Sequence, residues 1–389
     1  MDKVLRTGTI LAFTFGLFFL GRSLVNPFDI FLISLALFSL LKNPGGMILF
    51  FKGNGKYYLF ALSFLFSISL SIFGAPDKFE VLKNLIQFSA YTLLISLTFA
   101  IKRDIVEDIK LTFTLISIIF LLYSFPLFCI PKPVRLSAFE IHPNALGFIF
   151  SLFAVLNLRN LPLFLFFSFM SSLTFSRASL LGLFISVLVF SFLEKRPKFA
   201  LFAFLPLLLS LSMPNFIQIY KSSSICEFIN KKKTLPSAPA TDIKLVRIYD
   251  LDRVRLIEAS MKMFSKNPIT GVGLGNFNVV VREMCKKGEL NNAQCSAAMP
   301  QRDAHNFIFG FLAETGIVGL FSFIIFFGFL TVVLISSGDN LGISIFTLSI
   351  FMSLLHPPVF FTRFMGPLVW YIILKGKLKI PSYEGSGKV

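Results

Sequence analysis

Three histidines are the side chains of this sequence best suited to moving a proton near neutral pH, because an unperturbed imidazole has a pKa of about 6.5. His142 and His356 each precede a proline, and we expect an ordinary hydrogen-bonding role for both. His305 differs, since it stands in the run Asp303-Ala304-His305-Asn306, shortly before Leu-Ala-Glu314-Thr-Gly. A histidine can take the proton of an attacking hydroxyl, so His305 is the candidate general base.

Arginines at two places could bind an anion. Arg177 lies in a short turn between two apolar segments, where burial on a membrane helix costs about 2.5–3.5 kcal/mol unless an anion, a cavity or water compensates. Arg253 and Arg255 open an amphipathic run, and a guanidinium there could hold a phosphate through paired hydrogen bonds. The alternatives are a snorkelling side chain at Arg177 and solvated surface charges at the other two positions.

A glycine-rich turn follows that run, in Pro268-Ile-Thr-Gly271-Val-Gly273-Leu-Gly275-Asn276-Phe277. It is not a dinucleotide-binding fingerprint, because the third glycine comes too soon and a βαβ context is missing. The lysine-serine pair of a Walker motif is also missing from it. We expect the turn either to allow close backbone packing or to cradle a phosphate.

Carboxylates and cysteines form no pattern typical of a metal site. Asp250-Leu251-Asp252 indicates the start of a helix, where acidic side chains interact favourably with the positive end of the helix dipole. No spacing of histidine and cysteine resembles a zinc site. Cys285 and Cys295 could form a disulfide in an oxidising compartment, or remain isolated thiols. We therefore expect neither a metal nor a cofactor.

These residues belong to a chain that is too apolar for a soluble protein. The sequence is 55% hydrophobic and 15% charged, against about 45–50% and about 25% in soluble proteins. Since a membrane helix needs about 20 apolar residues, the sequence predicts an all-α polytopic membrane protein with about 12 transmembrane helices. The predicted spans are roughly 8–24, 28–41, 57–74, 84–101, 111–130, 144–158, 161–175, 178–193, 199–213, 316–336, 341–357 and 365–376.

Basic residues orient the spans, because short cytoplasmic loops are enriched in lysine and arginine. The enrichment predicts that both termini are cytoplasmic and that Arg177 and the three histidines lie on the outer side. About half of the net charge of +17 then faces the anionic membrane lipid of the inner leaflet. The rest gives the outer side a basic surface, so we do not expect nucleic acid as a partner.

One long polar stretch divides the chain into three predicted regions. Residues 1–214 hold the first nine spans, 215–303 form a large outer loop, and 304–389 hold the last three spans and a cytoplasmic tail. Within the loop, residues 251–266 predict an amphipathic helix that lies on, or packs against, the outer ends of the spans. Its apolar residues recur at helical spacing: Val254, Ile257, Met261 and Phe264.

The order of these motifs resembles the O-antigen ligase and polymerase superfamily of bacterial inner-membrane glycosyltransferases. The matching pattern is an arginine before a helix, Asn267-Pro268-x-x-Gly271-x-Gly273-x-Gly275-Asn276-Phe277, His305-Asn306, and Leu312-Ala313-Glu314-x-Gly316-x-x-Gly319-Leu320. It covers residues 253–325 strongly and 174–182 moderately. Within the superfamily, the chain looks most like an O-antigen ligase.

The resemblance implies a GT-C-like enzyme whose donor is a glycan on undecaprenyl pyrophosphate, used at the periplasmic face. His305 matches the family histidine proposed to assist the acceptor hydroxyl, and Arg177 and Arg253 match the arginines thought to hold the donor pyrophosphate. Arg255 fits the family distance to the glycine turn less well, and the family's frequent tryptophan is Ile257 here. Two guanidiniums can stabilise the leaving pyrophosphate without a metal, and direct displacement would invert the anomeric carbon.

The leading hypothesis is transfer of a finished glycan from its lipid carrier to a sugar of lipid A-core, and the modest length and single large outer loop favour it. A glycan polymerase and a protein O-oligosaccharyltransferase, which commonly carries extra C-terminal sequence, are the enzymatic alternatives. A transporter of lipid-linked glycans is the non-enzymatic alternative. A transporter needs no hydroxyl-activating histidine, so His305 favours an enzyme.

Overall fold

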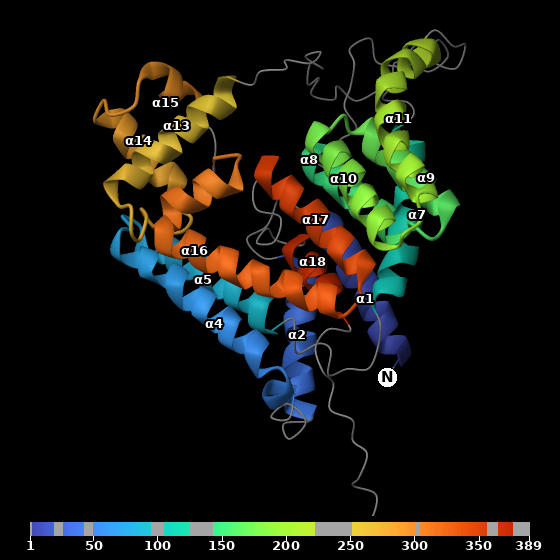
Figure 1. The fold of residues 1–389 in the computed structure, drawn as a ribbon, viewed down its shortest axis with the longest axis horizontal. Coiled ribbons are helices and arrows are strands. Elements are labelled where there is room, and N and C mark those ends of the chain that lie inside the picture. Colours follow the sequence, from blue (N-terminus) through green and yellow to red (C-terminus); the bar gives the residue numbers. More distant parts are fainter. Residues whose placement is uncertain are drawn as a thin grey trace, which may run out of the picture. The chain divides into compact units, whose positions relative to one another are not determined.

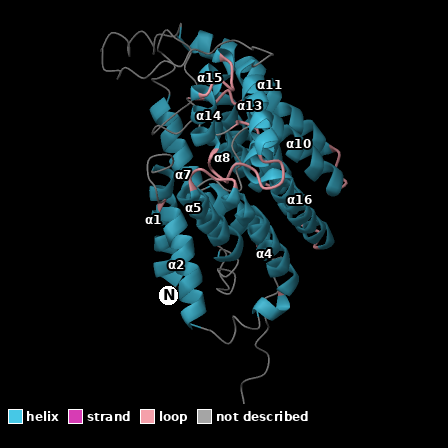
Figure 2. Ribbon diagram, turned by 90° about the vertical axis from the view of Figure 1, so that its left-hand side faces the viewer, coloured by secondary structure: helices cyan, strands magenta, loops and turns pink. Residues whose placement is uncertain are grey.

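The computed structural model describes residues 2–18, 26–42, 50–94, 105–124, 143–221, 251–299, 304–355 and 365–375. Within these ranges the chain forms helices joined by turns and contains no strand, as the sequence predicts (Figures 1 and 2). Each span predicted from the sequence overlaps a helix. Two of the described helices, Gly55–Phe73 and Phe307–Ser336, are long and apolar enough to cross a membrane, and shorter apolar helices accompany them. The number of spans stays a prediction.

Two compact units make up the chain, and each is assembled from separate stretches of sequence. Unit 1 contains Met1–Phe28, Asp104–Ile248 and Asn340–Met352. Unit 2 contains Asp29–Arg103, Tyr249–Asp339 and Ser353–Val389.

Unit 1 is a helical bundle around a phenylalanine core. Its helices are α1 (Asp2–Phe18), α7 (Val106–Ser124), α8 (Pro143–Leu156), α9 (Leu161–Leu173), α10 (Arg177–Leu193), α11 (Lys198–Lys221) and most of α17 (Asn340–Leu355). Helix α8 is buried along almost its whole length and contacts α9 and α10. The ring of Phe113 stacks on Phe153 with centroids 4.0 Å apart and lies 5.6 Å from that of Phe167.

Glu194, just after α10, joins three turns of unit 1. Its carboxylate accepts hydrogen bonds from Arg159 Nη2 at 2.9 Å and from Asn340 Nδ2 at 3.2 Å. The hydrogen bond from Asn340, together with the nearby Arg159 guanidinium, lowers the pKa of Glu194. Glu194 therefore connects the turns after α8 and α10 to the start of α17.

Unit 2 combines long apolar helices with a group of short amphipathic ones. Its helices are most of α2 (Pro27–Lys42), α4 (Gly55–Ser69) with the 3-10 turn η1 (Leu70–Phe73), α5 (Lys78–Ser89) with the π-turn η2 (Ala90–Leu94), α13 (Leu251–Lys266), α14 (Phe277–Lys286), α15 (Asn292–Ala298), α16 (Phe307–Ser336) and α18 (Met365–Leu374). Helix α16 runs beside α4 (Figure 1), and Phe60 stacks on Phe329 at 4.4 Å between them.

The amphipathic helix predicted over residues 251–266 is confirmed with the same bounds as α13, but the face that it buries differs from the predicted one. The buried residues are Leu256, Ala259, Ser260 and Met263. Val254 and Met261, which belong to the predicted apolar stripe, are 37% and 39% exposed. Small residues at 259 and 260 let α13 approach α15 and α16 closely, so packing outweighs the position of the largest apolar side chains.

Candidate functional site

A break at Gly316 divides helix α16 into two helical segments, 307–315 and 317–336. Gly316 has φ 66° and ψ −169°, a backbone conformation far from helical. Such a break leaves carbonyl groups before it and amide groups after it without partners inside the helix. In an apolar environment each unpaired backbone group costs free energy, so another part of the protein must provide its hydrogen-bond partner.

The glycine-rich turn provides hydrogen-bond partners for the backbone on both sides of this break. Its amides at Val272 and Gly273 donate to the carbonyl oxygens of Ala313 and Glu314, both at 2.9 Å. In return, Ile317 N and Val318 N of the second helical segment donate to the carbonyl oxygens of Pro268 at 2.9 Å and Ile269 at 3.3 Å. The glycine-rich turn and the motif around Gly316 are therefore joined to each other by backbone hydrogen bonds.

Glycine is required where the two backbones meet. Gly271 has φ 74°, and a Cβ atom there would overlap with the carbonyl group of Glu314. A Cβ atom on Gly316 would overlap with the carbonyl group of Ile269. An added side chain at either position would separate the turn from the helix.

The turn is also anchored to the segment between α4 and α5. Leu274 N donates to Ser71 Oγ at 3.1 Å, and the Asn276 side chain exchanges two 3.0 Å hydrogen bonds with the backbone of Asp77. Gly273 and Gly275 lie so close to Ala75 and Asn84 that neither has room for a Cβ atom. The sequence does not reveal Ser71 and Asp77 as partners of the turn, because residues about 200 positions away along the chain leave no local signal.

Most amides of the turn therefore donate to the protein itself. Phe277 N donates to Glu314 Oε1 at 3.1 Å, which gives that carboxylate a structural partner. The amides that donate in this way are those of Gly271, Val272, Gly273, Leu274, Asn276 and Phe277. Of the two roles expected from the sequence, the structure supports close packing rather than a phosphate cradle.

His305 precedes α16 and has a backbone conformation that is uncommon for residues other than glycine. Its φ is 49°, in the left-handed region, and its side chain is half-buried. The next residue, Asn306, caps the helix by accepting a hydrogen bond from Phe309 N at 3.3 Å. Holding a non-glycine residue in this region costs about 1–3 kcal/mol, and such strain is concentrated at functional sites.

Arg253 and His305 lie at the same end of unit 2. Helix α13 and the first segment of α16 both end at the glycine turn, and Leu256 and Ala304 belong to one buried cluster, so the two helices run in the same direction (Figure 1). At about 1.5 Å per residue, Arg253 lies about 20 Å before the end of α13, and the start of α16, which His305 precedes by two residues, lies about 12 Å before the break. Arg255 instead pairs with Asp252 at 3.2 Å.

Arg177 belongs to unit 1, where it is the first residue of α10. The preceding Ser176 caps the helix by accepting a hydrogen bond from Ser179 N at 3.4 Å. The side chain of Arg177 is exposed, whereas Ser176, Ala178 and Ser179 are buried. A guanidinium at a helix N-terminus adds its charge to the positive end of the helix dipole, which suits an anion.

Comparison with known families places these residues in one matched region. Residues 162–324 match the family model described as O-antigen ligase. This similarity covers less than half of the chain. No curated protein matches the sequence. The matched range contains Arg177, Arg253 and His305, and members of this family are membrane proteins and glycosyltransferase-like ligases or polymerases. The resemblance inferred from the sequence motifs is thus confirmed.

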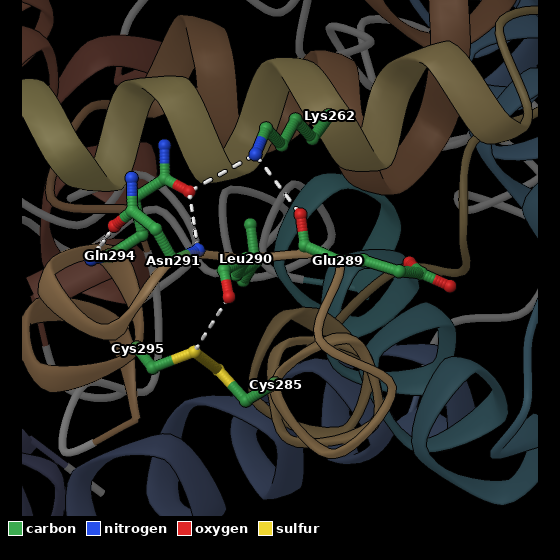
Figure 3. Close-up of a disulfide and its surroundings, with 7 residues drawn as sticks. All are labelled: Lys262, Cys285, Glu289, Leu290, Asn291, Gln294 and Cys295. Carbon is green, nitrogen blue, oxygen red and sulfur yellow. Dashed lines mark hydrogen bonds between the residues drawn. A yellow bond between two sulfur atoms is a disulfide. The ribbon is translucent and has the colours of Figure 1, made fainter.

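A disulfide and a polar network hold α13, α14 and α15 together within the O-antigen ligase family region. Cys285 and Cys295 form the disulfide, which resolves the choice that the sequence left open (Figure 3). Lys262 Nζ donates to the Glu289 carbonyl oxygen at 3.0 Å and to Gln294 Oε1 at 3.2 Å. These contacts tie α13, which carries Arg253, to α15 and to the turn that precedes it.

Two of the weaker candidates, His142 and His356, lie outside the described residues. Among the residues that are described, no three histidine, cysteine, aspartate or glutamate side chains gather in a group that could hold a metal ion.

Proposed function

We propose that the protein is an O-antigen ligase. It transfers a glycan from undecaprenyl pyrophosphate to a sugar hydroxyl of lipid A-core, at the periplasmic face of the bacterial inner membrane. The observation that carries the proposal is the family match over residues 162–324, which contains the candidate base and both candidate anion-binding arginines. The single long polar stretch at 215–303 favours a ligase over a polymerase.

In the proposed reaction, His305 is the general base. Its imidazole accepts the proton of the acceptor hydroxyl while that oxygen forms a bond to the anomeric carbon of the donor. The bond between the anomeric carbon and the pyrophosphate oxygen breaks, and the configuration inverts. Support comes from the half-buried side chain of His305 and from its strained backbone, a feature that is concentrated at functional sites.

Arg177 and Arg253 are proposed to bind the donor pyrophosphate. The leaving group gains negative charge as the bond breaks, and guanidinium groups aimed at those oxygens stabilise the transition state, with no metal required. The exposed Arg177 at a helix start and the position of Arg253 at the His305 end of unit 2 support this assignment.

The proposed setting is a GT-C-like fold of about 12 spans with both termini in the cytoplasm. The apolar helices of both units support it, as does the distribution of basic residues along the sequence. The outer side then carries a basic surface toward a lipid-linked pyrophosphate.

The decisive experiment gives purified protein an undecaprenyl-pyrophosphate-linked glycan and one acceptor at a time. The acceptors are lipid A-core, a second lipid-linked glycan, and a pilin. We expect a joined product with lipid A-core. Transfer to the second lipid-linked glycan alone would show a polymerase, transfer to pilin a protein glycosyltransferase, and movement of intact donor across vesicles without transfer a transporter.

A further inference from the structure

Buried hydroxyl groups surround the turn that carries Arg177. They come from α8, α9, the turn itself and α10, and each is fully buried: Ser151, Ser168, Ser171, Ser172, Thr174, Ser176 and Ser179. Small hydroxyl residues of this kind let membrane helices approach closely and hydrogen-bond across their interface. The turn between α9 and α10 is therefore packed into unit 1, although Arg177 itself is exposed.

Helix α8 holds the residues on both sides of Arg177. Ser151 Oγ lies 2.9 Å from Ser171 Oγ of α9 and donates to the carbonyl oxygen of Ser179 in α10 at 3.2 Å. Ser171 Oγ also donates to the carbonyl oxygen of Gly147 at 3.3 Å. These bonds link one stretch of α8 to the end of α9 and to the first turn of α10.

The turn itself has a tightly determined geometry. Phe175 has φ 49°, which is uncommon for a residue with a side chain. Thr174 Oγ1 donates to the carbonyl oxygen of Ser171 at 2.7 Å and accepts from Ser176 N at 3.3 Å, and Ser179 Oγ donates to Ser176 Oγ at 2.7 Å. A displacement of any of these groups would move the start of α10.

Gly147 of α8 packs against this turn and the start of α10. A Cβ atom on Gly147 would lie 2.6 Å from both Ser179 Oγ and Thr174 Oγ1, and 2.9 Å from Ser176 Cβ. All three neighbours are fully buried and belong to the turn or the first turn of α10, so they have no open space into which to move. Even one added methyl group must push the turn away from α8.

We propose that Gly147 is a positioning residue for Arg177. Its missing side chain lets α8 approach the turn, and this approach fixes where α10 begins and where the guanidinium is presented. The inference rests on the proposed function, in which Arg177 binds the pyrophosphate of the lipid-linked donor. Gly147 lies outside the matched family region, and it is buried within unit 1, so the role proposed for it is to position Arg177 and not to bind a substrate.

The test measures the Kd for undecaprenyl pyrophosphate, because this probe needs no acceptor. We expect Gly147→Ala to raise the Kd about tenfold or more, since small misplacements of a binding group have effects of this order. The control is Gly182→Ala, another helical glycine of unit 1, whose Cβ atom would meet the flexible end of the Leu348 side chain at 3.0 Å. The control should keep the Kd of the wild type.

A double-mutant cycle separates positioning from general damage. If Gly147 acts through Arg177, Gly147→Ala adds no further increase in the Kd of the Arg177→Ala protein. An equal increase in both backgrounds would overturn the positioning role while leaving Arg177 as a binding residue. An Arg177→Ala protein with unchanged Kd would overturn the assignment of Arg177, and the positioning role with it.

A second variant covers the case in which Gly147→Ala does not fold. Ser179→Ala removes the hydrogen bonds that Ser179 Oγ donates to Ser176 Oγ and, at 3.4 Å, to the carbonyl oxygen of Asn144 in α8, and it adds no bulk. We expect Ser179→Ala to raise the Kd less than Gly147→Ala does. This rise should also disappear when Arg177 is replaced by alanine. An unchanged Kd in folded Ser179→Ala protein, together with no folded Gly147→Ala protein, would argue that the contact serves stability alone.

Discussion

His305 has a backbone conformation that asparagine and glycine adopt more readily than histidine does. The sequence indicated its chemistry, because an imidazole after a long polar stretch is a plausible base. It could not indicate the conformation, since the left-handed φ depends on the packing of Ala304 and on the start of α16. The protein therefore carries a histidine at a position where glycine or asparagine would be less strained.

Replacement of His305 by asparagine should separate these two properties. Asparagine tolerates a φ of this kind, so His305→Asn should fold at least as well as the wild type, with an unchanged or slightly higher Tm. Glycan transfer should fall by about 10²–10⁴-fold, the usual contribution of a positioned acid or base. The measurements are Tm and single-turnover transfer at equal folded amounts. Undiminished transfer would remove His305 from the catalytic role.

Glu314 also belongs to the family pattern, and its observed partner is an amide of the glycine turn. Glu314→Gln keeps an oxygen that can accept the hydrogen bond from Phe277 N, whereas Glu314→Ala leaves that amide without it. We expect the alanine variant to lose about 1–3 kcal/mol in the free energy of unfolding and the glutamine variant to lose less. Denaturant unfolding compares the two. A glutamine variant that is stable but inactive would show a chemical role instead.

At the scale of elements, the local patterns predicted individual helices better than the break within one. The bounds of α13 followed from its amphipathic run, and the predicted span at 316–336 begins at the break in α16. The helical segment 307–315 before that break was not predicted, because its partner is a turn some 40 residues earlier in the sequence. The buried face of α13 was also missed, since small residues pack there instead of large apolar ones.

The contact between the turn and the broken helix can be tested with a matched pair of glycines. Gly271 and Gly288 have φ 74° and 70°, but a Cβ atom would overlap with Glu314 at the first and meets nothing within 4 Å at the second. Gly288→Ala should lower the free energy of unfolding by only about 1–2 kcal/mol, the penalty for a side chain at positive φ. Gly271→Ala should cost clearly more and lower the folded yield. Equal losses in thermal unfolding would contradict the proposed contact.

The contribution of Glu194 to the stability of the fold should decrease in acid. The folded pKa of Glu194 lies below its usual value of 4.5, so its ionised form stabilises the fold. This contribution is present above about pH 4.5 and is lost as the pH falls through the lowered folded value. The Tm difference between wild type and Glu194→Gln should therefore be largest near pH 7 and shrink toward pH 3. A difference that does not change with pH would exclude this linkage.

At the scale of the whole molecule, composition predicted a membrane protein, and the length of the apolar runs predicted that it is all-helical. Hydropathy located the helices because each apolar run is continuous along the chain. It could not predict the two units, because each combines stretches of sequence that are far apart. The ordered motifs indicated the family, since the pattern of glycines, histidine and glutamate depends on spacing within about 60 residues.

The predicted topology places two exposed glycine turns on opposite sides of the membrane. Gly288 and Gly338 both have positive φ and open space around them, so a short epitope should be tolerated after either. An antibody added to cells with a permeabilised outer membrane should bind the epitope at Gly288. It should bind the epitope at Gly338 only after the inner membrane is disrupted. The reverse result would invert the topology and contradict a periplasmic site.

The exchange of hydrogen bonds between the glycine turn and the broken helix also affects how such sequences diverge. The two backbones leave no room for a side chain at Gly271 or at Gly316, so both positions must stay glycine for the exchange to persist. Arg177, Arg253 and His305, the residues proposed to act on the substrates, take no part in this exchange of backbone hydrogen bonds. A descendant of this chain can therefore exchange its arginines or histidine for other chemistry and still inherit the same scaffold.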